Sequence, residues 1–122
     1  MTDQTEQFWG YHLTINAGDC SRAAVTDAVH IADFARALVK AIDMVAYGEP
    51  QIVHFGDDNK AGYTLIQLIE TSNIAAHFCD STGDIYLDVF SCRPYDIEVA
   101  KDLFCEYFKP ARLNSNFFTR QA

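Results

Sequence analysis

Short stretches of the chain alternate apolar and polar residues, the pattern of strands with one buried face. Turn-forming residues separate these stretches, most clearly at Gly56-Asp57-Asp58-Asn59 and at Asp80-Ser81-Thr82-Gly83. The segments predicted to be strands are 8–15, 52–55, 63–69, 74–78, 85–90 and 113–119.

Two longer segments carry apolar residues at three- and four-residue steps, which is the spacing of a helix with one buried face. The first stripe is Ala24, Ala28, Ile31, Ala35, Leu38, Ile42 and Val45. It predicts one helix, capped by Asp19 or Ser21 after a turn at 16–19, and ended by Gly48 and Pro50. The second stripe is Ile97, Ala100, Leu103, Phe104, Tyr107 and Phe108. Pro94 is expected in the first turn of that second helix, and Lys109-Pro110 at its end.

The resulting element order is β-α-β-β-β-β-α-β, within a single domain over residues 1–122. This order predicts an α+β fold, a two-layer sandwich of a mainly antiparallel sheet with two helices on one face. The opposite face of the sheet then carries aromatic residues without a covering layer. Because a second copy would cover it most simply, we expect a homodimer.

The balance of charged side chains limits the kinds of ligand that the protein is expected to bind. The chain has 9 basic and 17 acidic side chains and a net charge of −8. This balance disfavours binding to nucleic acids or to anionic membrane surfaces, and mildly favours a cationic small molecule. The polar, acidic start at 1–6 is unlike a signal peptide, so a cytoplasmic location with reduced cysteines is expected. Without a Cys-x-x-Cys pair, and with scattered histidines, no metal site is expected.

Polar groups gather between two predicted strands at residues 70–79. Ser72 stands at the strand junction, His77 follows five residues later, and Cys92 ends the next strand. Since antiparallel neighbours bring distant residues together, a hydroxyl, an imidazole and a thiol are expected to converge here. The alternative is structural: a turn serine, a hydrogen-bonded histidine and a buried thiol.

These residues lie in segments that resemble the short bacterial and archaeal S-adenosylmethionine decarboxylase proenzymes. That family carries Glu-Ser-His-Leu-Thr-Ile-His at its self-cleavage site, where this chain has residues 71–77. The family's following glycine corresponds to Gly83, and its Asp-Leu-Phe-Thr-Cys segment to residues 88–92. Upstream, 62–64 is similar to a Gly-x-Ser segment, and 10–13 to the opening Gly-x-His-Leu.

The resemblance implies self-cleavage between Thr71 and Ser72, which converts the serine into a pyruvoyl group. His77 would be the processing residue, and the hydroxyl of Thr64 would assist it. The pyruvoyl ketone would then accept the substrate amine and act as an electron sink while carbon dioxide leaves. Cys92 would return the proton. The implied activity is decarboxylation of S-adenosylmethionine for spermidine synthesis.

This chain departs from the family at several positions. Thr71 stands where the family has glutamate and Asn73 where it has histidine, both in positions that support processing. Cys79-Asp80-Ser81 replaces an aromatic-Pro-Glu stretch and loses the glutamate expected to bind the substrate's ribose, so Asp80 is its candidate substitute. The aromatic residues that are candidates for stacking on an adenine ring are Phe8, Phe55 and Phe78.

These departures leave two alternative hypotheses. One is a pyruvoyl-dependent decarboxylase of another amino acid, such as ornithine or arginine. The other is an unprocessed, non-catalytic homologue that acts as a binding or regulatory subunit. A hydrolase built on Cys92 and His77 is disfavoured because the sequence has no nucleophile elbow.

Overall fold

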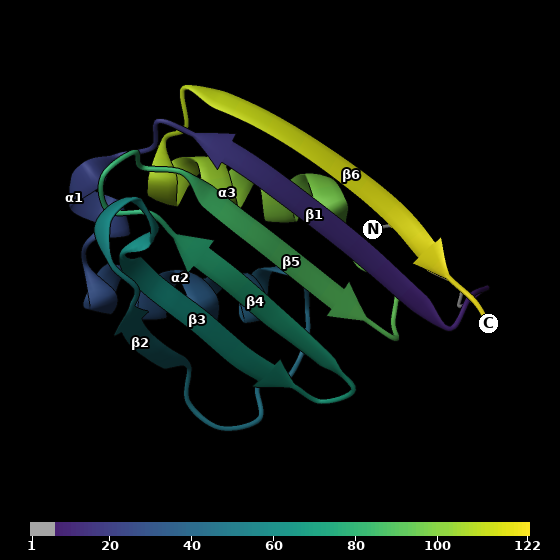
Figure 1. Cartoon of the computed structure of the whole chain (residues 1–122). Coiled ribbons are helices and arrows are strands. Elements are labelled where there is room, and N and C mark those ends of the chain that lie inside the picture. The colour runs from purple at the N-terminus through teal and green to yellow at the C-terminus, as the bar shows by residue number, and fades with distance from the viewer. Residues whose placement is uncertain (1–6) are drawn as a thin grey trace.

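The computed structural model describes residues 7–122 and shows, over this range, one six-stranded sheet (Figure 1). The strand order is β2-β3-β4-β5-β1-β6, and every neighbouring pair is antiparallel. The bounds are β1 Gly10–Gly18, β2 Gln51–Phe55, β3 Gly62–Ile69, β4 Ser72–Phe78, β5 Ile85–Ser91 and β6 Arg112–Arg120. The last strand therefore returns to the edge beside the first.

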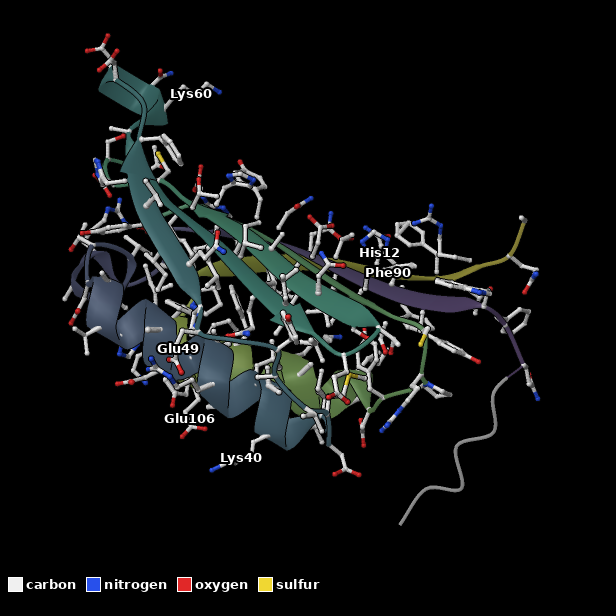
Figure 2. All side chains as sticks on the ribbon, turned by 90° about the horizontal axis from the view of Figure 1, so that it is seen from below. His12, Lys40, Glu49, Lys60, Phe90 and Glu106 are labelled. Atoms are coloured by element: carbon white, nitrogen blue, oxygen red, sulfur yellow. The ribbon has the colours of Figure 1, made fainter. Side chains whose placement is uncertain are left out.

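The helices cover one face of this sheet (Figures 1 and 2). They are α1 Arg22–Val25, α2 Ala28–Ala41 and α3 Ile97–Phe108, and a short 3-10 helix, η1 Asp58–Lys60, precedes β3. Figure 2 shows His12 and Phe90 on the opposite side of the sheet, which no helix covers. We call this side the open face. The predicted α+β two-layer sandwich is confirmed.

The core lies between the helices and the sheet, because alternate strand residues and one stripe of each long helix point there. Its fully buried side chains include Leu13, Ile15, Ile31, Phe34, Leu38, Leu65, Ile74, Val89, Phe104 and Phe108. One polar side chain joins β1 to β5: the Tyr95 hydroxyl donates to the Val89 carbonyl at 2.7 Å and accepts the Leu13 N–H at 3.1 Å. Burial raises the pKa of this phenol well above its ordinary range.

The expectation of one helix over residues 24–45 is wrong. The Asp27 carboxylate accepts the N–H groups of Val29 and His30, so a new helix begins there and separates α1 from α2. The second helix ends at Ala41, and the chain then turns through Asp43, whose φ is 60°. Gly48 therefore lies in a connecting segment and does not cap the helix.

Two other boundaries differ from the sequence prediction. The predicted turn at 16–19 is strand up to Gly18, because both neighbours of β1 pair with those residues, and only Asp19 turns. Pro94 lies before α3 and outside its first turn, since the Asp96 carboxylate caps the helix. The predicted ends of the remaining strands lie within two residues of those observed.

Within residues 7–122, no helix is long and apolar enough to cross a membrane.

Candidate active site

Ser72 begins β4 directly after the tightest turn in the sheet. Ile69 and Ser72 pair across β3 and β4, which leaves Glu70 and Thr71 as the only residues of the turn. Thr71 has a φ of 64°, the left-handed region that disfavours β-branched residues, and its hydroxyl donates to the carbonyl of Glu70. The Thr71–Ser72 peptide bond therefore follows a residue with a strained backbone conformation.

The carbonyl of Thr71 is the atom group that a Ser72 hydroxyl would attack. The backbone N–H of Cys92 donates to this carbonyl oxygen at 3.4 Å, across the end of the β4–β5 pairing. Such a donor stabilises negative charge that develops on the oxygen during attack. Ser72 and Cys92, which are distant in the sequence, thus meet at the turn.

Among residues 7–122, the hydroxyl of Ser72 has no hydrogen-bond partner although its oxygen is buried. Alternation along β4 places this side chain on the helix-covered side, with Ile74, while Asn73 points to the open face beside Phe90. An unpartnered buried hydroxyl costs stability, so it calls for a functional explanation. Attack on the adjacent carbonyl is one that the local geometry offers.

His77 lies at the other end of β4, so the expected convergence of Ser72, His77 and Cys92 within one chain is wrong. Five strand residues span about 16 Å, and an odd separation places the two side chains on opposite faces. The His77 imidazole instead contacts Thr64 of β3, with 3.3 Å between Nδ1 and Oγ1. Five residues along one strand therefore keep Ser72 and His77 apart in space.

Of the predicted substrate-binding residues, Asp80, Phe55 and Phe78 also lie toward the His77 end, whereas Phe8 contacts Tyr11 at the Ser72 end. The Asp80 carboxylate hydrogen-bonds to Nε2 of His54 at 2.7 Å, so one of its oxygens is already engaged. Phe55 is exposed at the end of β2. Phe78 is buried against Phe108, so its ring is not available to a ligand in this conformation.

A cavity of about 410 Å³ adjoins this end, and His77, Cys79 and Lys60 are among its lining residues. Hydrogen bonds from Thr82 and then Ser81 lower the pKa of the Cys79 thiol. In residues 7–122, no group of three or more His, Cys, Asp or Glu side chains is arranged to hold a metal ion.

The sequence analysis missed an aromatic cavity at the Ser72 end of the sheet. This second cavity, also of about 410 Å³, is lined by Trp9, Phe90 and Arg120 among others. Trp9 is 63% exposed and stacks on Phe90, with ring centroids 6.1 Å apart and planes at 24°. The strand register brings these rings together, and Gly10 makes room for them, because a Cβ there would lie 2.7 Å from the Phe90 ring.

A polar chain supports this cavity on the open face, where Figure 2 shows His12 near Phe90. Nε2 of His12 lies 3.1 Å from a carboxylate oxygen of Asp88, and its Nδ1 lies 3.1 Å from the Arg120 guanidinium. Because Arg120 can only donate, Nδ1 must accept and Nε2 must carry the proton. The guanidinium is thereby held over the Phe90 ring, 5.6 Å from its centroid.

The family model for S-adenosylmethionine decarboxylase matches residues 11–121. The chain therefore belongs to the S-adenosylmethionine decarboxylase family, as the resemblance in the sequence indicates. Among solved structures, 27 chains match, and one of them is the crystal structure of the adenosylmethionine decarboxylase from Aquifex aeolicus VF5. That structure is similar with a TM-score of 0.81 and 18% sequence identity, over 95% of this chain and 93% of the other. No curated protein sequence matches.

Proposed function

We propose that this protein cleaves itself between Thr71 and Ser72 and then decarboxylates S-adenosylmethionine, in the pathway to spermidine. The observation that carries the proposal is the buried, unpartnered hydroxyl of Ser72 beside a strained residue. The carbonyl of that residue already accepts an N–H from Cys92. Family membership supplies the reaction class, and these residues supply a place for it.

The processing chemistry balances with the residues present. The Ser72 oxygen attacks the carbonyl carbon of Thr71 while its proton passes to the amide nitrogen, and the C–N bond breaks to leave an ester. Loss of the Ser72 Cα proton, which we assign to the His77 imidazole of a second copy, expels the Thr71 carboxylate. Water then replaces the amine of the resulting dehydroalanine, ammonia leaves, and a pyruvoyl group caps the new N-terminus.

The pyruvoyl ketone supplies the electron sink for loss of carbon dioxide. The Cys92 thiol follows β5 at the Ser72 end of the sheet and is our candidate for returning the proton. Trp9 and Phe90 offer a planar aromatic surface for the adenine ring. A cytoplasmic location keeps the Cys92 thiol reduced, which this role requires.

We further propose that two copies pair through their open faces. Ser72 and Cys92 lie at one end of the sheet, and Thr64 and His77 at the other. Two sheets stacked about a two-fold axis, with strands running in opposite directions, bring each end of one copy to the opposite end of its partner. The His77 imidazole and the candidate substrate contacts Asp80 and Phe55 would then act at the Ser72 of the other copy.

The first test is an intact mass under denaturing conditions. Cleavage gives fragments of 71 and 51 residues, the smaller with a blocked, ketone-bearing end, whereas an unprocessed chain gives a single 13.7 kDa species. Ser72→Ala should abolish cleavage and leave the fold intact. Cleavage that persists in that variant would mean that the wrong residue is assigned.

The pairing has its own test by complementation. Ser72→Ala and His77→Ala chains with different tags are expected to stay intact when each is expressed alone. When they are co-expressed, the His77→Ala chain should be cleaved, because its partner supplies the imidazole, and the Ser72→Ala chain should not. Absence of cleavage in the mixture, where the wild type is cleaved, would refute action of His77 between copies.

Two other functions keep specific support. Thr71 and Asn73 replace a glutamate and a histidine next to the cleavage site, which favours an unprocessed binding or regulatory subunit. Asp80 replaces the expected ribose-binding glutamate and is engaged by His54, which favours a different amino acid substrate such as ornithine or arginine. An intact mass decides the first, and product analysis with each amino acid decides the second.

A further inference from the structure

Ser91 is one of two fully buried polar side chains in residues 7–122, and the chemistry above does not use it. It faces Ser72 directly across the β4–β5 pairing. The bond from the Cys92 N–H to the Thr71 carbonyl flanks this pair, so Ser72 and Ser91 form a close pair without mutual backbone hydrogen bonds. The Cα atoms in such pairs are about 4.5 Å apart, with side chains on the same face.

The hydroxyl of Ser91 makes one donated and one accepted hydrogen bond to other groups. Its oxygen accepts the backbone N–H of Arg93 at 2.9 Å, and its proton points to the sulfur of Met44 at 3.6 Å. Neither contact involves Ser72, whose buried hydroxyl has no partner among residues 7–122 although this second serine lies opposite it. Ser91, which faces the Ser72 nucleophile, therefore makes no hydrogen bond to it.

The bond from Arg93 to Ser91 closes a turn around Cys92, the residue between them. The same turn directs the Cys92 N–H to the carbonyl oxygen of Thr71. The Arg93 side chain also donates to the carbonyl of Asp43 at 3.1 Å, which fixes the turn to the segment 43–48.

The segment 43–48 also contacts the turn of Glu70 and Thr71, which we call the cleavage turn. The N–H of Glu70 donates to the carbonyl of Val45 at 3.0 Å, and Ala46 pairs with Ile69 at the end of β3. Met44 therefore connects Ser91 to the segment that fixes Glu70. Contacts of Ser91 therefore connect β3, which ends before the cleavage turn, with β4, which begins after it.

From this arrangement we infer that Ser91 is a positioning residue for self-cleavage. Its hydroxyl holds the turn that directs the Cys92 amide to the Thr71 carbonyl. The inference rests on the proposed self-cleavage and names a residue that acts through Cys92 and Thr71 without touching the bond that breaks.

The first arm of the test measures cleavage rates by intact mass after synthesis of the chain. Ser91→Ala should slow cleavage on the order of tenfold, because a misplaced donor stabilises the developing oxyanion less well. Ser91→Thr retains the hydroxyl and should restore the rate to within a few-fold of the wild type. Ser115→Ala, a matched change on the edge strand β6, should leave the rate unchanged.

A third substitution at Ser91 is a control for loss of folding in the alanine variant. Ser91→Cys fills the space with a poor hydrogen-bond acceptor, so it should be slow like the alanine variant even if alanine leaves the chain unfolded. The inference is overturned if Ser91→Cys is cleaved at the wild-type rate. It is also overturned if the folded threonine variant is as slow as the cysteine variant.

The second arm does not depend on cleavage. In a Ser72→Ala background, Ser91→Ala or Ser91→Cys should accelerate hydrogen exchange at the amides of Cys92 and Arg93, with the core amides unchanged. Unchanged exchange at both amides would overturn the inference even if the wild type is cleaved. A wild-type chain that stays intact would refute the proposed function alone, since this exchange measurement still decides whether Ser91 holds the amide.

Discussion

The left-handed conformation of Thr71 supports a quantitative test of the cleavage turn. We expect Thr71→Gly to stabilise the uncleaved fold and to slow self-cleavage. A φ of 64° costs an L-residue roughly 1–2 kcal/mol, a cost that glycine does not carry. Glycine instead loses about 0.5–1 kcal/mol through the greater freedom of the unfolded chain. The net gain in the free energy of unfolding is therefore about 0–1.5 kcal/mol.

The strain alone, without the term for the unfolded chain, bears on the rate, because cleavage starts from the folded chain. Attack by Ser72 lengthens the connection through the turn by one atom, because the ester runs through the serine side chain. Strain at Thr71 is then partly released in the transition state, and loss of about half of the 1–2 kcal/mol should slow cleavage about twofold to fivefold. Urea unfolding in a Ser72→Ala background gives the stability, and intact mass against time gives the rate in the chain that retains Ser72.

A substitution series separates strain from other effects. Thr71→Asn, which tolerates the left-handed region, should fall between threonine and glycine in both measurements, and Thr71→Val should resemble threonine. The reasoning fails if glycine destabilises the fold by more than about 0.5 kcal/mol, since the strain would then be smaller than the entropy term. Faster cleavage in the glycine variant would equally rule out strain as a driving force.

Other regions give further expectations. Tyr95→Phe should lower the free energy of unfolding by about 2 kcal/mol, since two buried backbone groups lose their partner. Because the pKa of folded Tyr95 is raised, the wild type should also lose stability as the pH rises above 10, and this contribution should be absent in the phenylalanine variant. Iodoacetamide at pH 8 should label Cys79, whose pKa is lowered, well before Cys20, whose pKa burial raises to about 11, and equal rates would contradict this. If decarboxylation of S-adenosylmethionine is observed, Trp9→Ala should raise KM about tenfold with little change in kcat, Trp9→Phe should raise it less, and an unchanged KM would exclude stacking on this ring.

The sequence predicted the six strands and their succession along the chain well, because hydrophobic alternation is a local signal. The helix boundaries were harder, since the carboxylate of Asp27 stops one apolar stripe and starts another without interrupting its period. The turn at 16–19 was predicted from its composition, but pairing on both sides outweighed that preference.

The candidate site shows a different limit. Ser72 and Cys92 were expected to meet because antiparallel neighbours bring distant residues together, and the β4–β5 register confirms this part of the expectation. His77 was expected beside Ser72, yet the geometry of one strand is enough to separate them. The stack of Trp9 on Phe90 depends on a register between β1 and β5 that no local pattern reveals.

The order of strands has a consequence for the chain after cleavage at Thr71–Ser72. The fragment before the cut would own β1, β2 and β3, and the fragment after it would own β4, β5 and β6. Because β1 lies between β5 and β6, a strand of the first fragment would be paired on both sides with strands of the second. The two pieces could not separate without opening three ladders of hydrogen bonds, β3–β4, β1–β5 and β1–β6, so a cleaved chain would still behave as one folding unit.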